Sequence, residues 1–156
     1  MSTDSAPWQQ RDVLSFSEHS LRSYQSLLGR ELTAPGSLIE RAARLFEADY
    51  VVLSHTAANV PVYNYGNALA LKLWELPWDA FVAMESHKCA EPMAQEARDC
   101  FLQEVETQGF ATGHSGVRIS ASGRRFRIDD VTCWNVYDEA GTRIGQAATY
   151  QQWTFL

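Results

Sequence analysis

The final third of the chain places the strongest constraint on its fold, because three strand-like segments follow one another there with little between them. The helical periodicity stops at Gly109, and strand-like patterns then cover roughly residues 110–120, 125–137 and 143–155. Ser122-Gly123 separates the first two segments, and the stretch from Asp138 to Gly141 separates the second from the third. Both connections have the composition of hairpin turns. Short turns place successive strands next to each other, so we predict an antiparallel three-stranded unit.

Alternation along the middle segment predicts which side chains share a face of this unit. One face is expected to carry Phe126, Ile128, Thr132, Trp134 and Val136. The other face is expected to carry Arg125, Arg127, Asp129, Cys133 and Tyr137. Two more arginines, Arg118 and Arg124, lie close by in the sequence. A cluster of guanidinium groups binds a carboxylate or a phosphate in some proteins and forms the solvated face of a strand in others, and both interpretations stay open.

The first two thirds of the chain read mainly as helix. An amphipathic helix is predicted over residues 11–28 with Gly29 as its stop, and a second helix begins after Ser37, whose capping box is completed by Glu40. Two short strands over residues 50–53 and 61–65 predict a hairpin. Further helices are predicted over residues 68–74 with Asn67 as N-cap, over residues 78–84, and from Pro92 to Gly109.

A chain of 156 residues has the size of one domain. The order of its elements fits an α+β fold, in which one five-stranded antiparallel sheet carries helices on one side. Residues 1–36 are expected to form an N-terminal helical extension, followed by a core of residues 37–156. An amphipathic helix ahead of a core either packs on its own sheet or lends its apolar face to a second copy. We predict self-association as a homodimer.

The composition argues against several classes of partner and site. A formal net charge of −6 makes the chain a poor match for nucleic acid or an anionic membrane. No apolar stretch approaches the roughly 18 residues that span a bilayer, and the first residues lack the basic start and apolar core of a signal peptide. We therefore expect a cytoplasmic protein. The three cysteines match no zinc or redox spacing, so reduced thiols and no metal site are predicted.

Short segments in order along nearly the whole chain carry a more specific signal. They are Ser23-Tyr24 with Leu28 to Leu32, Leu53-Ser54-His55, Tyr65-Gly66-Asn67, Ala90-Glu91-Pro92, Ser115 to Ser120, Gly123 to Phe126, Trp134-Asn135 and Gly145 to Ala148. Together these segments resemble the MEKHLA domain, a family related to the PAS domains. The resemblance implies a PAS-like fold, in which a hairpin, a helical crossover and a three-strand meander enclose a small cavity.

The resemblance also implies a regulatory or sensory role. PAS relatives bind flavin, haem, small acids or nothing. The residues around Cys89 lack the pattern that surrounds a photoactive flavin cysteine, and haem would need an axial ligand such as His55, His87 or His114. Neither cofactor is expected, and a small organic ligand remains the option. A signal received by the domain would leave through a protein partner.

The candidate ligand-binding residues combine apolar walls with a few hydrogen-bonding groups. They are His55, Tyr65, Asn67, Trp74, Arg118, Trp134, Asn135 and Gln146. The alternative is a core that these aromatic side chains fill completely, in which the buried amides tie strand to helix.

Catalysis is the competing function, in the form of a small enzyme of unknown reaction that uses His55 and the arginine-bearing strands. Two serine–histidine neighbours, Ser54-His55 and His114-Ser115, are the best catalytic candidates. Adjacent residues on an extended strand point to opposite faces, so neither pair forms a dyad. We predict no catalytic residue. The expected function is a non-enzymatic module that binds a small molecule or mediates protein association.

Overall fold

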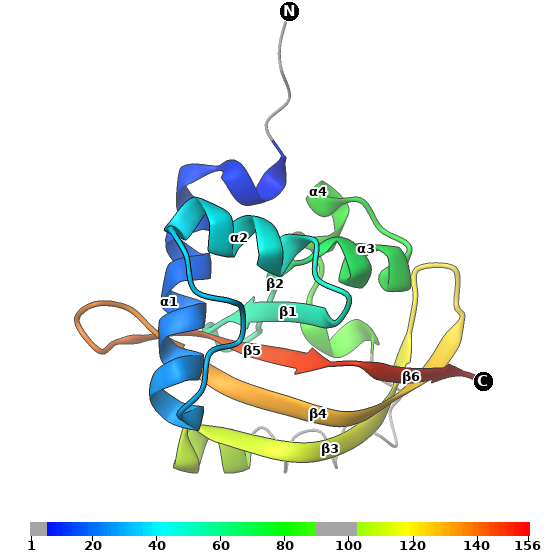
Figure 1. Cartoon of the computed structure of the whole chain (residues 1–156). Helices are drawn as coiled ribbons and strands as arrows, with labels where there is room; N and C mark the ends of the chain where they lie inside the picture. Colours follow the sequence, from blue (N-terminus) through cyan, green and yellow to red (C-terminus); the bar gives the residue numbers. More distant parts are fainter. Residues whose placement is uncertain (1–5, 90–102) are drawn as a thin grey trace, which may run out of the picture.

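A single antiparallel sheet of six strands organises the computed structural model, which describes residues 6–89 and 103–156. The strands are β1 (Val51–Thr56), β2 (Tyr63–Gly66), β3 (Phe110–Ile119), β4 (Arg125–Tyr137), β5 (Arg143–Tyr150) and β6 (Gln152–Phe155). They lie in the order β2-β1-β5-β4-β3, and β6 pairs with β4 beyond the end of β5 (Figure 1). The predicted third long strand is thus divided at Gln151, which explains why the sheet has one strand more than expected.

The regular alternation predicted for β4 is wrong. Asp130 adopts a left-handed φ of 53°, and the pairing of β4 with β3 shifts between Val131, opposite His114, and Ile128, opposite Gly116. One extra residue in a strand reverses the faces of everything that follows. Phe126, Ile128 and Val131 therefore pack into one core, whereas Trp134 and Val136 pack into the other.

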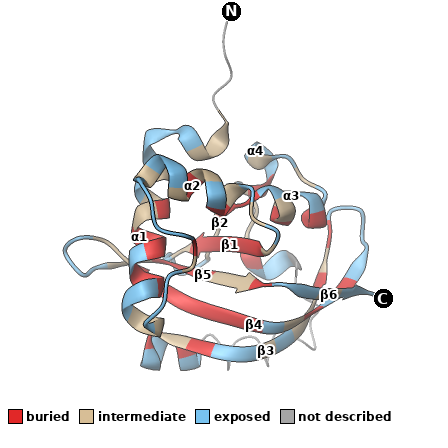
Figure 2. Ribbon diagram, in the orientation of Figure 1, coloured by how far each residue is buried: buried red, intermediate tan, exposed pale blue. Residues whose placement is uncertain are grey.

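Helices cover both faces of the sheet. The pocket-side core consists of Val51, Leu53, Tyr63, Ala70, Leu73, Trp74, Phe81, Phe126, Ile128, Val131 and Tyr150. It lies under α3 (Ala68–Trp74) and α4 (Trp78–Phe81), so the helices after the hairpin pack on one side as predicted. The α1-side core consists of Val13, Leu21, Tyr24, Leu45, Val52, Tyr65, Trp134, Val136 and Ala147. It joins α1 (Arg11–Leu28) and α2 (Leu38–Phe46) to the opposite face (Figure 2).

Helix α1 uses its apolar face within its own chain. The ring of Tyr24 meets Trp134 edge-on, with 4.8 Å between centroids. Trp134 Nε1 donates a hydrogen bond to the carbonyl of Ser20 at 3.1 Å, and the backbone N–H of Tyr137 donates to Ser23 Oγ at 2.9 Å. Of the two arrangements considered for this helix, packing on its own sheet is the one present. Self-association remains a prediction, and this face does not supply its contact.

Local sequence signals place most helix boundaries correctly. Gly29 ends α1 with a φ of 73°, and Ser37 forms the expected capping box with Glu40. The helix predicted over residues 78–84 stops at Phe81. The beginning of the helix predicted from Pro92 lies outside the described residues, but residues 103–108 are helical and Gly109 ends them. Two short 3₁₀ segments, η1 (Pro7–Gln9) and η2 (Ser86–Cys89), complete the elements named here.

Asn67 joins three elements through one fully buried amide. Its Oδ1 caps α3 by accepting from the N–H of Ala70 at 3.1 Å and also accepts from the N–H of Val52 at 3.2 Å. Its Nδ2 donates to the carbonyls of Leu45 at 3.1 Å and Tyr50 at 2.8 Å. The side chain therefore links the end of α2 and the start of β1 to the first turn of α3.

Replacing Asn67 with alanine should cost far more stability than removal of an ordinary helix cap. We expect Asn67→Ala to lower the free energy of unfolding by about 3 kcal/mol or more, because several buried backbone groups lose their partner. The exposed cap Ser37 is the matched control, and Ser37→Ala should cost about 1 kcal/mol. Urea unfolding measures both. Equal losses for the two variants would show that Asn67 acts as a simple cap.

Candidate functional site

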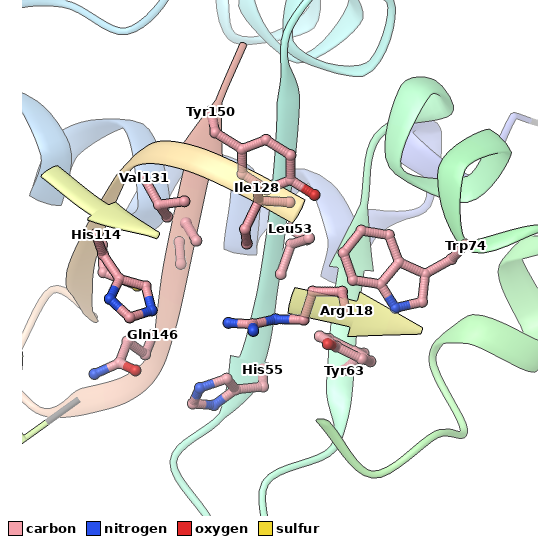
Figure 3. A pocket seen from close by; sticks show the side chains of 13 residues that line it. Leu53, His55, Tyr63, Trp74, His114, Arg118, Ile128, Val131, Gln146 and Tyr150 are labelled. Atoms are coloured by element: carbon pink, nitrogen blue, oxygen red, sulfur yellow. The ribbon is translucent and has the colours of Figure 1, made fainter. Parts of the chain in front are cut away.

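A small pocket lies between the sheet and α3, within the pocket-side core. It encloses about 50 Å³. Its apolar wall comprises Leu53, Trp74, Ile128, Val131 and Ala148. Figure 3 shows Leu53 and Ile128 on the sheet side and the indole of Trp74 reaching in from α3. Five of the six strands, β1 to β5, supply lining residues, so the pocket depends on the assembled sheet and not on one segment.

Polar side chains line the other part of this pocket. They are His55 from β1, His114 and Arg118 from β3, and Gln146 and Tyr150 from β5. Among the described lining residues none is aspartate, glutamate or lysine. The arginine therefore gives the lining a net positive charge that no described acidic neighbour balances. Such a mixture of apolar wall and a few converging polar groups is typical of a site for a small ligand.

Three alternate positions on β3 build the charged part of the pocket. His114, Gly116 and Arg118 face the same side of the strand, opposite Val131, Ile128 and Phe126 of β4. A Cβ atom at position 116 would lie 2.8 Å from Arg118 Nη1 and 3.5 Å from His114 Nε2. Glycine therefore leaves room for the guanidinium to lie back over the strand toward His114, and Figure 3 shows it directed between His55, His114 and Gln146.

The arginines of the predicted cluster do not share a face. Arg118 is only 8% exposed and pairs with Phe126, whereas Arg125 and Arg127 pair with Ile119 and Val117 on the opposite face. The interpretation in which these arginines bind an anion together is therefore wrong, and the solvated interpretation holds for Arg127. Arg127 Nε lies 3.3 Å from Asp129 at the surface, and the guanidinium of Arg124 lies 3.4 Å from the ring centroid of Phe155. Arg118 alone enters the pocket.

Arg118 has no acidic partner among the described residues. Its Nη1 donates to the carbonyl of Val117 at 3.0 Å, and no ion pair in the described ranges involves it. Removing a guanidinium from water without a counter-charge is costly, and most buried charges in proteins are paired.

The orientation of the Gln146 amide follows from its neighbour Asn135. Asn135 Nδ2 donates to the carbonyl of Val105 at 3.2 Å, so its Oδ1 is the atom that accepts from Gln146 Nε2 at 3.3 Å. Gln146 Oε1 is then left without a hydrogen-bond partner in a side chain that is 2% exposed. The indole N–H of Trp74 is likewise unpartnered among the described residues. Buried polar atoms usually have partners, so these two atoms indicate where a ligand or water would bind.

The serine hydroxyls of the two serine–histidine neighbours bond to residues other than the histidines. Ser54 donates to Asn64 Oδ1 at 2.5 Å and Ser115 donates to Asp129 Oδ1 at 3.1 Å, so each hydroxyl is engaged away from its histidine. His55 Nδ1 donates to the carbonyl of Thr56 at 2.9 Å, because a carbonyl oxygen only accepts. In the neutral ring the Nε2 atom of His55 is then the acceptor.

The structure divides the eight candidate residues between the two faces of the sheet. His55, Trp74, Arg118 and Gln146 line the pocket. Asn135 lies behind Gln146, while Tyr65 and Trp134 belong to the α1-side core and Asn67 joins three elements. The predicted ligand-binding residues did not include His114 and Tyr150, although His114 was considered as a haem ligand and as a catalytic candidate. Alternation would have found His114, because it lies four residues before Arg118 on the same strand.

The residues present do not fit a flavin or a haem. Sites for ligands of that size usually enclose about 300–1,000 Å³, whereas this pocket encloses about 50 Å³. His87 lies at the surface beside Glu85, at 3.5 Å, and not in the pocket. Within residues 6–89 and 103–156, no three His, Cys, Asp or Glu side chains gather closely enough to hold a metal ion. In the same ranges no helix is both long and apolar enough to cross a bilayer.

Comparison with known proteins agrees with the predicted family and fold. The MEKHLA domain model matches residues 14–155. A PAS domain of a protein from Colwellia psychrerythraea is similar in structure, with a TM-score of 0.64, 16% identity and coverage of 76% of this chain and 96% of that domain. No curated protein resembles the chain closely enough in sequence to count as a relative.

Two further solved structures share the fold. A light-oxygen-voltage domain studied with a flavin analogue has a TM-score of 0.56 and 11% identity, and the match covers 75% of this chain and 84% of that domain. A PAS domain from a two-component sensor histidine kinase has a TM-score of 0.56 and 13% identity, covering 73% of this chain and 91% of that domain. The PAS-like α+β fold is therefore confirmed.

Tyr65 allows a test of whether a buried hydroxyl in the α1-side core lacks a hydrogen-bond partner. Its hydroxyl is buried without a partner among the described residues, and this burial raises its pKa above the ordinary tyrosine range. We expect Tyr65→Phe to leave the free energy of unfolding at pH 7 unchanged or to raise it by up to about 1 kcal/mol. In the wild type the unfolded chain ionises first, so stability should fall as pH rises above about 10, and Tyr65→Phe should remove that part of the slope.

The matched control is Tyr137→Phe, because the Tyr137 hydroxyl accepts a hydrogen bond from Asn135 Nδ2 at 3.3 Å. This variant should lose stability at pH 7. Urea unfolding at pH 7 and above pH 10 measures both variants. A clear loss of stability in Tyr65→Phe at pH 7 would show that its hydroxyl has a partner.

Proposed function

Since this chain belongs to the MEKHLA domain family, whose PAS-like members are sensory and regulatory modules, we propose that it binds a small molecule in the pocket beneath α3. One observation carries the proposal. Two deeply buried polar atoms, Gln146 Oε1 and Trp74 Nε1, have no partner among the described residues in a pocket that also holds Arg118. A core filled only by side chains would leave these groups unsatisfied at a cost of about 1–3 kcal/mol each.

Binding without conversion is the proposed mode of action. Each serine beside a pocket histidine donates its hydroxyl to another residue, Asn64 or Asp129, and no described lining residue is a carboxylate. Neither serine hydroxyl is therefore available to its neighbouring histidine as an activated nucleophile. A bound compound should be recovered unchanged after prolonged incubation with the protein. Recovery of a converted compound would favour the enzyme alternative based on His55.

A conformational change caused by the ligand would have to pass through the sheet and its helices to affect a protein partner. Lining residues come from all of the strands β1 to β5, and Trp74 comes from α3. A ligand that contacts Trp74 and Arg118 therefore bridges a helix and the edge strand β3. Such a ligand would bias the position of α3 relative to the sheet, which is the kind of two-state change that a regulatory module transmits. The partner is a second protein or a second copy of this chain.

Native mass spectrometry of the freshly purified full chain tests the proposal. We expect a mass above the denatured mass in the wild type and a bare mass for Ala148→Leu, because the larger side chain occupies the pocket and should cost about 1–3 kcal/mol in stability. Ala140→Leu, in the exposed turn between β4 and β5, is the matched control and should keep the ligand.

A negative result has a defined meaning as well. A bare wild-type mass, together with no thermal stabilisation by any compound in a panel of small neutral, cationic and anionic metabolites, would overturn the ligand-binding proposal. The same spectra report whether the chain is a monomer or a dimer. Protein association would then remain as the function.

A further inference from the structure

We propose that the pocket ligand is a small monocarboxylate whose carboxyl group binds Arg118. The inference rests on the proposed function, because it names the chemical class of the molecule that the pocket takes. Arg118 is 8% exposed, has no acidic partner among the described residues, and points into the space between β1, β3 and β5 (Figure 3).

The charge of the pocket selects an anion. Arginine keeps its charge at any physiological pH, and the described lining residues contribute no carboxylate to oppose it. A buried guanidinium without a counter-ion carries a desolvation penalty that a bound anion would relieve. The forked N–H groups of arginine match a carboxylate, which accepts two parallel hydrogen bonds. A single permanent positive charge suits a single negative charge better than a polyanion.

The backbone of β3 holds the guanidinium ready for this role. Gly116 has no side chain, so Arg118 Nη1 lies 2.8 Å from the position that a Cβ atom would occupy there. His114 Nε2 lies 3.5 Å from the same point. Arg118 Nη1 and His114 Nε2 therefore both lie close to the space that a side chain at position 116 would occupy. Any larger residue at position 116 would push the guanidinium away from the pocket without removing its charge.

The volume of the pocket limits the size of the ligand, and its apolar wall limits the polarity of the part outside the carboxyl group. About 50 Å³ is several times the roughly 10–15 Å³ that one water needs. The pocket is therefore suited to about three to five non-hydrogen atoms. Leu53, Ile128 and Val131 form an apolar wall that suits the carbon end of an organic acid better than an inorganic oxyanion. Gln146 Oε1 is a buried acceptor without a hydrogen-bond donor among the described residues. A hydroxyl group on the acid could donate to it and should therefore strengthen binding.

Calorimetric and thermal-shift titrations of the full chain at constant ionic strength test the inference. The probes are acetate, glycolate, the neutral analogue glycolamide, and nitrate as an inorganic anion. Glycolate should bind most tightly and acetate next. Glycolamide should bind at least tenfold more weakly than glycolate, because a charge-assisted pair with arginine is lost. Nitrate should bind more weakly than acetate.

Three variants connect the binding to Arg118. Arg118→Gln should weaken glycolate at least tenfold while the unliganded protein stays folded, since an unbalanced buried charge has been removed. Gly116→Ala keeps the charge but displaces the guanidinium, and it should also weaken glycolate. Arg127→Gln, the same change on the exposed arginine that pairs with Asp129, is the matched control and should bind as the wild type does. Circular dichroism and urea unfolding report whether each variant is folded.

The outcomes separate this inference from the proposed function. Equal binding of glycolate and glycolamide, unchanged binding in both folded Arg118→Gln and Gly116→Ala, or preference for nitrate would each overturn the inference. So would wild-type protein that binds none of the carboxylates. If native spectra then still show a retained neutral compound that Ala148→Leu excludes, the proposed function stands and only the carboxylate assignment fails. A bare mass and no binding to any metabolite would remove both.

Discussion

The break in alternation at Asp130 distributes the residues of β4 between two cores, and both the docking of α1 and the pocket follow from it. Ile128 and Val131 flank the break and both face α3, while Trp134 faces α1. An unbroken strand would bring Phe126 and Trp134 to the same face. Asp130 holds a backbone conformation that is uncommon for a residue with a side chain, and the burial of both faces of β4 offsets that cost.

The two cores differ in the charge that they bury, because only the α3 side holds a buried arginine among the described residues. On the α1 side, Trp134 Nε1 donates to Ser20 and the backbone of Tyr137 donates to Ser23. Ser17 Oγ, His19 Nδ1 and Tyr65 Oη are buried there without a hydrogen-bond partner among the described residues, but none of these three atoms belongs to an arginine or lysine. On the α3 side, Trp74 and Gln146 each leave a polar atom unpartnered beside the charge of Arg118. One face thus behaves as a structural core and the other as a candidate binding site.

Much of the fold was predictable because local rules dominate it. The left-handed stop at Gly29, the capping box of Ser37 and the turn chemistry before β4 and β5 each act over a few residues. Family resemblance added the arrangement of these parts as a PAS-like sheet. The division of the last strand at Gln151 was not predictable, because it depends on the pairing of β6 with β4 beyond the bulge. The second layer of helices depended on tertiary packing in the same way.

The candidate site shows the same division of information. The sequence by itself determined the element types, the hairpin turns, the α+β class and the presence of four of the pocket residues, His55, Trp74, Arg118 and Gln146. Only the tertiary structure decided that Arg118 points inward while Arg125 and Arg127 point outward, and that Tyr65, Asn67 and Trp134 serve packing. The physical reason is parity: one extra residue in a strand exchanges its faces, and pairing between distant strands decides where that residue is accommodated.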